Sequence, residues 1–179
     1  MGGNMRTLKI ALGLSLLFLV TVSVAAQKAT TDWDHGINFS EYKTFMWIQQ
    51  PHMENPAMDK RVVDDINKQL AHKGWKLVND NADVGVVAHG SADKEMTLEL
   101  FYVGFPEGWQ WHWWEGATVT KVTTYPVGTL VVDLFDTKAK RVVWRGIAND
   151  TFSVKAKKNA HRLEEAIEDM FSHFPPKSK

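Results

Sequence analysis

The sequence predicts a single α+β domain: a mostly antiparallel sheet with two helices packed on one face. Two segments repeat apolar residues at helical spacing, and the segments between them alternate in the manner of strands. The 179-residue chain has 44% hydrophobic residues, 21 basic against 21 acidic side chains, and no cysteine. This composition excludes wholesale disorder, a strongly basic nucleic-acid surface and thiolate metal sites.

Residues Met1 to Ala26 are typical of a secretory signal peptide. Arg6 and Lys9 supply the positive start, Ile10 to Val24 is largely apolar, and small residues precede a cut before Gln27. We therefore expect a periplasmic or secreted protein whose single domain spans residues 27–179. The alternative is an uncleaved anchor, although the apolar run is shorter than the roughly 20 residues that cross a bilayer.

The first half of the domain predicts strands at Thr30 to Asp34 and Thr44 to Gln49. A helix is expected from Asp59 to Lys73, with Asp59 capping its start and Gly74 just past its end. Its apolar stripe consists of Val62, Val63, Ile66 and Leu70, at spacings of three and four.

The second half predicts further strands and one more helix. The strands are Val84 to Ala88, Met96 to Val103 and Thr118 to Thr124, followed by a hairpin of Gly128 to Asp136 and Arg141 to Thr151. A helix is expected from Asn159 to Phe174, ended by two prolines.

The hairpin predicts one specific pair of residues. A loop centred near Ala139 places Asp133 opposite Arg145 and Leu134 opposite Trp144. Opposite charges across a strand pair are favourable by about 0.2–1 kcal/mol. We interpret Asp133 and Arg145 as a structural pair that sets the register and takes no part in chemistry.

The most unusual segment is Gly108 to Gly116, which holds four of the eight tryptophans: Trp109, Trp111, Trp113 and Trp114. Tryptophan suits stacking on a sugar, a membrane interface or a protein contact. The alternative is that alternate residues point inward, as in an ordinary strand or a loop that covers the core. Four indoles this close are difficult to bury together, so we take these residues as candidate binding residues.

Other chemistry is weakly indicated. His89, Ser91 and Asp93 alternate along one predicted strand, but residues two apart point alongside each other and do not form a nucleophile–base pair. Asn79, Asn81 and Asp83 match the start of a calcium loop that lacks its glycine and glutamate. We predict no catalytic residues, no metal site and no cofactor.

Several motifs in order resemble one family, named domain of unknown function 4136. They are Thr31-Asp32-Trp33-Asp34, Leu70-Ala71-x-x-Gly74-Trp75, Gly128-Thr129-Leu130-Val131-Val132-Asp133, Val143-Trp144-Arg145-Gly146 and Phe174-Pro175-Pro176. The resemblance implies a bacterial envelope protein of no established activity. Many members are regarded as lipoproteins, whereas this chain lacks the cysteine for lipidation.

Two functions remain open from the sequence. The first is a non-enzymatic binding or structural module that contacts an envelope protein, a glycan or a membrane surface through the Trp-rich segment. The alternative is a hydrolase or transferase acting on an envelope polymer, which would need carboxylates or histidines that meet in a pocket. We expect no nucleic-acid partner, and the sequence does not determine the oligomeric state.

Overall fold

The computed structural model describes residues 29–53, 55–91, 94–110, 124–149, 151 and 156–176. The predicted signal peptide lies outside these residues, and so do most of the predicted strand from Thr118 to Thr124 and the residues Trp111, Trp113 and Trp114. No helix in the described ranges is both long and apolar enough to span a bilayer.

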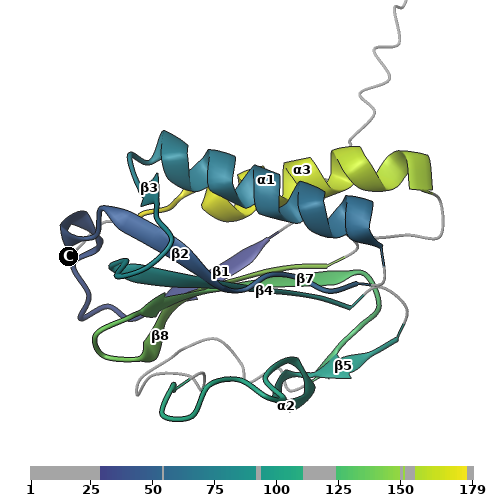
Figure 1. The fold of residues 1–179 in the computed structure, drawn as a ribbon. Helices are drawn as coiled ribbons and strands as arrows, with labels where there is room; N and C mark the ends of the chain where they lie inside the picture. The colour runs from purple at the N-terminus through teal and green to yellow at the C-terminus, as the bar shows by residue number, and fades with distance from the viewer. Residues whose placement is uncertain are drawn as a thin grey trace, which may run out of the picture.

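A six-stranded sheet forms the centre of the domain, with two long helices on one face (Figure 1). The strand order is β1 (Thr30–Trp33), β8 (Arg141–Ala148), β7 (Thr129–Asp136), β4 (Val84–Ser91), β2 (Thr44–Gln49) and β3 (Lys76–Leu77). The helices are α1 (Pro56–His72) and α3 (Ala156–Ser172). The single α+β domain predicted from the sequence has this architecture.

The sheet is mixed. The pairs β1–β8, β8–β7 and β7–β4 are antiparallel, whereas β2 pairs in parallel with both β3 and β4. The parallel pairs arise because α1 crosses over the sheet between β2 and the next strands, so the chain returns in its original direction. The predicted mostly antiparallel arrangement therefore holds for the β1–β8–β7–β4 part only.

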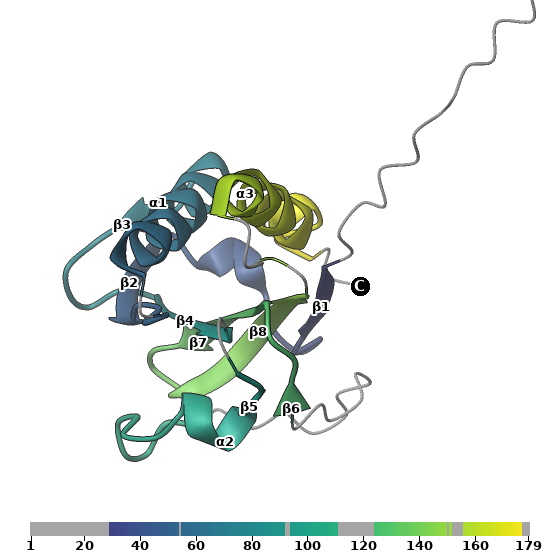
Figure 2. The ribbon, with the colours of Figure 1, turned by 90° about the vertical axis from the view of Figure 1, so that its right-hand side faces the viewer.

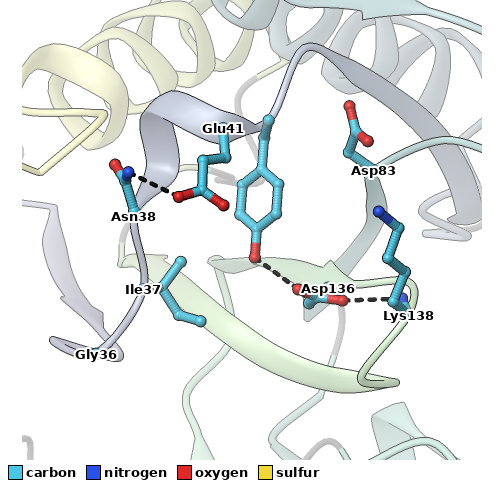
Figure 3. A pocket seen from close by; sticks show the side chains of 8 residues that line it. Gly36, Ile37, Asn38, Glu41, Asp83, Asp136 and Lys138 are labelled. Atoms are coloured by element: carbon cyan, nitrogen blue, oxygen red, sulfur yellow. Dashed lines mark hydrogen bonds between the residues drawn. The ribbon is translucent and has the colours of Figure 1, made fainter.

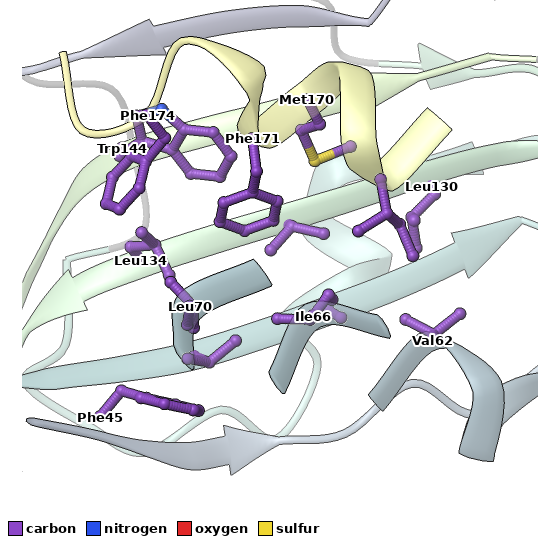
Figure 4. Packing of buried hydrophobic residues seen from close by; sticks show 14 of the residues in the cluster. Phe45, Val62, Ile66, Leu70, Leu130, Leu134, Trp144, Met170, Phe171 and Phe174 are labelled. Atoms are coloured by element: carbon purple, nitrogen blue, oxygen red, sulfur yellow. The ribbon is translucent and has the colours of Figure 1, made fainter. Parts of the chain in front are cut away.

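The main core lies between the two helices and the sheet (Figure 4). Val62, Ile66 and Leu70 of α1 are fully buried, as their predicted stripe requires. Phe171 and Phe174 pack against Trp144, with ring centroids 5.1 and 5.4 Å away. This core packs both long helices onto one face of the sheet.

The start of α1 differs from the prediction. Asn55 is the N-cap and accepts a hydrogen bond from the Met58 backbone N–H, with Pro56 in the first turn. Asp59 lies inside the helix, where its carboxylate accepts a hydrogen bond from the Met53 backbone N–H at 3.0 Å. Proline is favoured at this point because the missing N–H would have no partner inside the helix.

The predicted strand Met96 to Val103 is wrong. Only Met96–Thr97 is a strand, β5, and the chain then forms a short helix, α2 (Leu98–Phe101). Thr97 accepts a hydrogen bond from the Leu100 backbone N–H and so caps this helix. A threonine placed before a turn offers the backbone this alternative to a strand.

Segment α2 lies on the face of the sheet opposite the long helices (Figures 1 and 2). Together with β5 and β6 (Thr124–Tyr125), which pair in an antiparallel two-stranded sheet, it covers that face. We call residues 94–110 with β6 the aromatic cap. A second buried apolar cluster, separate from the main core, joins the cap to the sheet.

The β7–β8 hairpin pairs Asp133 with Arg145 and Leu134 with Trp144. Beyond Trp144 the register shifts, so that Phe135 pairs with Val142 and β8 holds one extra residue. Val142 therefore belongs to the cap-side cluster and Val143 to the main core, the reverse of strict alternation. One inserted residue inverts every later side chain in a strand.

Candidate functional site

Three charged residues form a row across the cap face of the sheet. The backbone pairing places Arg145 of β8 between Asp133 of β7 and Asp32 of β1. The Arg145 Nε donates to Asp133 Oδ1 at 2.5 Å, and Nη2 donates to Oδ2 at 2.6 Å. Neither side chain of this pair has exposed surface, and Asp32 is 5% exposed.

The aromatic cap covers this row. The Tyr102 hydroxyl donates a hydrogen bond to Asp133 Oδ2. The carboxylate therefore accepts hydrogen bonds from Arg145 of the sheet and from Tyr102 of the cap. His89 of β4 stacks on Phe101, with ring centroids 4.9 Å apart, and meets the edge of Tyr102 at the same distance. Tyr125 stacks on Phe101 at 5.5 Å. The site is therefore a charged pair enclosed by aromatic rings.

Burial controls the ionisation of these groups. It lowers the pKa of His89 to about 4 and raises the pKa of Tyr125 to about 12, because each charged form loses its hydration. Burial also raises the pKa of Tyr102. Burial alone would lower the pKa of Arg145, but the charge and hydrogen bonds of Asp133 outweigh it and raise that pKa. Arg145 is thus a permanent cation, whereas His89 is neutral at pH 7.

The arrangement is suited to holding the sheet and the cap together. An enzyme would need these groups at the wall of an open pocket. Arg145 does have a second acidic neighbour in Asp32, but its side chain has no exposed surface. Because both side chains are fully buried, a substrate cannot reach the pair.

The predicted binding residues divide into two groups. Trp109 is described: its ring meets Phe105 at 6.1 Å and Phe135 at 5.7 Å, so it packs partly into the cap-side cluster. Trp111, Trp113 and Trp114 lie outside the described residues, so the proposed contact surface remains a prediction. The Gln110 backbone N–H donates to the carbonyl of Lys140, just before β8, and the Gln110 carbonyl accepts from the Val142 N–H of β8. These bonds anchor the start of the Trp-rich segment.

The other sequence candidates have structural partners or fall outside the description. Ser91 donates its hydroxyl to the Lys94 carbonyl, and Asp93 lies outside the described residues. The Asp83 carboxylate accepts hydrogen bonds from the Lys43 and Thr44 backbone N–H groups and the Thr44 hydroxyl. These bonds, the one from Lys43 foremost, lower the pKa of Asp83. The described ranges hold no group of three His, Asp or Glu side chains suited to a metal ion.

A surface pocket of about 310 Å³ lies away from the charged row, below the turn that precedes β2 (Figure 3). Tyr42 donates to Asp136 Oδ2 at 2.8 Å, and the backbone N–H groups of Lys138 and Ala139 donate to its Oδ1. Glu41 accepts a hydrogen bond from Asn38. The carboxylates of this pocket are thus held by the protein itself, and the geometry favours a turn-stabilising role for them.

Sequence reasoning missed two members of the site, Tyr102 and Tyr125. Tyr102 lies in the strand wrongly predicted over Met96 to Val103, and Tyr125 lies just after the strand predicted over Thr118 to Thr124. The spacing of Thr97 and the following apolar residues was the available signal for a capped helical turn. Asp32 was visible as part of a motif, but its place beside Arg145 required the pairing of β1 with β8.

The family model described as Domain of unknown function (DUF4136) matches residues 29–176. The chain belongs to this family. Its match covers all the described elements, including the three strands of the charged row. The charged residues of the row, Asp32, Asp133 and Arg145, also lie in the motifs on which the resemblance rests.

A solved structure from the same family shares this fold. A DUF4136 family protein from Bacteroides thetaiotaomicron aligns with a TM-score of 0.60 at 16% identity, covering 82% of this chain and 95% of that one. A PDZ domain protein from Parabacteroides distasonis aligns with a TM-score of 0.49 at 16% identity, covering 85% of this chain and 36% of that one. A PelC dodecamer from Paraburkholderia phytofirmans aligns with a TM-score of 0.42 at 14% identity, covering 79% of this chain and 96% of that one. No curated protein matches the chain.

Proposed function

We propose that this protein is an exported, non-enzymatic binding module of the bacterial envelope, and that the Trp-rich segment and the aromatic cap form its contact surface. One observation carries the proposal: apolar side chains are exposed on the same cap that anchors the Trp-rich segment. Leu100 of α2 is 52% exposed and Val103 is 74% exposed. Exposed apolar groups that lie together mark interaction sites.

The anchoring of the segment supports this proposal. Trp109 packs on the cap-side cluster, and Gln110 forms two backbone hydrogen bonds with the strand β8 region, at 2.7 and 2.9 Å. The tryptophans that follow in sequence therefore start from a fixed point beside the exposed cap. A contact surface on a fixed base loses less conformational freedom on binding than a free loop.

The alternative, a hydrolase or transferase acting on an envelope polymer, has less support. The charged pair Asp133–Arg145 is enclosed, and the pocket beside Tyr42 has carboxylates already bonded to protein donors. Neither offers a free general base beside an open cavity, as hydrolysis requires.

Photocrosslinking in the native envelope tests the proposal. A photoreactive residue replaces Trp111, and the matched control carries it at Leu77, which is 52% exposed on β3, away from the cap. We expect a discrete crosslinked adduct from position 111 and none from position 77. The Val103→Asp substitution should reduce the yield of the adduct from position 111. Equal adducts at both positions, or none at position 111, would contradict the proposal.

A further inference from the structure

The aromatic cap is built from short elements. It consists of the four-residue helix α2 and the two-residue strands β5 and β6, whereas the main core is built on two 17-residue helices. The two apolar clusters lie on opposite faces of the sheet and share no residue. Parts of a protein with few buried contacts open at lower free energy than its core, so the cap can separate while the helical face stays intact.

The imidazole of His89 on β4 lies where the cap meets the sheet. His89 is 6% exposed, and it lies against Phe101 and Tyr102 of the cap. Its Nε2 atom has no hydrogen-bond partner among the described residues. A neutral imidazole tolerates this place, but an imidazolium would lose its hydration, and the nearby carboxylate of Asp133 offsets only part of that loss.

We propose that the aromatic cap is an acid-sensitive lid, and that protonation of His89 separates the cap from the sheet while the main core stays folded. The imidazolium carries a hydrogen on Nε2, which has no acceptor among the described residues when the cap lies on the sheet. The resulting cation is best stabilised by water, which it reaches when Phe101 and Tyr102 move away. Opening also uncovers Asp133 and Arg145.

The charged and titratable groups around His89 favour this outcome. Asp133 of β7 already binds both the guanidinium of Arg145 and the hydroxyl of Tyr102. Arg145 of β8 is a permanent cation and repels a second one. Tyr102 and Tyr125 present neutral hydroxyls, and Glu99 is exposed on α2. The stacked Phe101 ring stabilises a cation through its face, but this stabilisation is smaller than the hydration free energy that burial removes.

The pKa of His89 supports this direction. In the closed form it is about 4, below the ordinary value of 6.5, because burial disfavours the charged ring. The open form takes up its proton near the ordinary value. The closed form therefore loses stability as the pH falls from about 6.5 to about 4, and the ratio of closed to open molecules falls by roughly 100-fold over that range.

Thiol labelling tests the lid directly, because the chain has no cysteine of its own. Val87→Cys places a thiol in the cap-side cluster, and Ala88→Cys places one in the main core, on the next residue of the same strand. Both positions are fully buried. The probe is 4,4′-dithiodipyridine, which reacts with thiols in acid, and each rate is divided by that of the same variant unfolded in urea at the same pH.

We expect labelling of the Val87→Cys variant to rise by roughly 100-fold between pH 7 and pH 4, while the Ala88→Cys variant stays protected. Adding His89→Gln, or His89→Asn where the glutamine variant does not fold, should remove most of this rise. Equal acceleration at both positions would show global unfolding and overturn the proposal. A rate at position 87 that is independent of pH, or a rise that persists without His89, would overturn it too. No binding partner is needed, so the result is independent of the crosslinking experiment.

Discussion

Arg145 binds both carboxylate oxygens of Asp133 from the neighbouring strand, with no exposed surface on either side chain. The two residues are direct partners in the β7–β8 register. Taking both charges out of water has a large cost, which only their close, two-point contact offsets. A register slipped by one residue would separate the charges, so the pair discriminates strongly against alternative strand pairings.

Breaking this pair should destabilise the domain strongly. Asp133→Asn and Arg145→Gln should each lower the free energy of unfolding by about 3–5 kcal/mol, because each leaves a buried charge without its partner. The double variant should lose much less than the sum, as measured by urea denaturation. The exposed pair Lys60–Asp64 is the control, with an expected coupling of about 0.5 kcal/mol or less. Additive losses at Asp133 and Arg145 would refute their coupling.

Removing the hydroxyl of Tyr102 should weaken the hold of the cap on the sheet. Tyr102→Phe leaves a buried carboxylate with one donor fewer, and we expect a loss of about 1–3 kcal/mol in the free energy of unfolding. Tyr42→Phe is the matched control, because the Tyr42 hydroxyl binds Asp136 in a half-buried site. Its expected loss is about 0.5–1.5 kcal/mol. Equal losses of unfolding free energy for the two variants would mean that enclosure does not strengthen the contribution of the Tyr102 hydrogen bond.

The tryptophans should divide into one structural residue and several contact residues. Trp109→Ala should lower the free energy of unfolding by about 2 kcal/mol, less than a fully buried tryptophan would, because the indole packs only partly on Phe105 and Phe135. Trp111→Ala and Trp113→Ala should change it by about 0.5 kcal/mol or less and abolish binding of the envelope partner. A large drop in melting temperature for Trp111→Ala would place that residue in a core and contradict its contact role.

The mature protein should begin at Gln27. Val24 and Ala26 provide the small residues that precede a signal-peptidase cut, and the intact mass of the exported protein measures where the cut falls. A mass that still includes Ile10 to Val24 would make this an anchored protein. Detection of the protein only in the cytoplasm would contradict export altogether.

The fold was predictable from the sequence wherever one local pattern was sufficient. The stripe of Val62, Ile66 and Leu70 predicted α1. Aromatic and apolar composition predicted β2, and strand alternation predicted the β7–β8 hairpin. The helix start was misplaced because both Asn55 and Asp59 are residue types that cap helices, and only the backbone shows that Asn55 does so.

The candidate site was less predictable, since it joins residues distant in sequence. Asp133 and Arg145 were paired correctly because a short loop connects their strands. Tyr102 and His89 reach the same place only through the cap, and Asp32 reaches Arg145 only through the pairing of β1 with β8. No local pattern encodes such contacts.

The sequence by itself determined the periodic elements, the single α+β domain and the Asp133–Arg145 register, because alternation and loop length act over a few residues. The tertiary structure decided the parallel pairing of β2 with β4, the aromatic cap opposite the helices, and the enclosure of His89. Periodicity shows that one face of an element is buried but does not show which element buries it. That choice depends on how all the faces pack at once, and only the folded chain makes it.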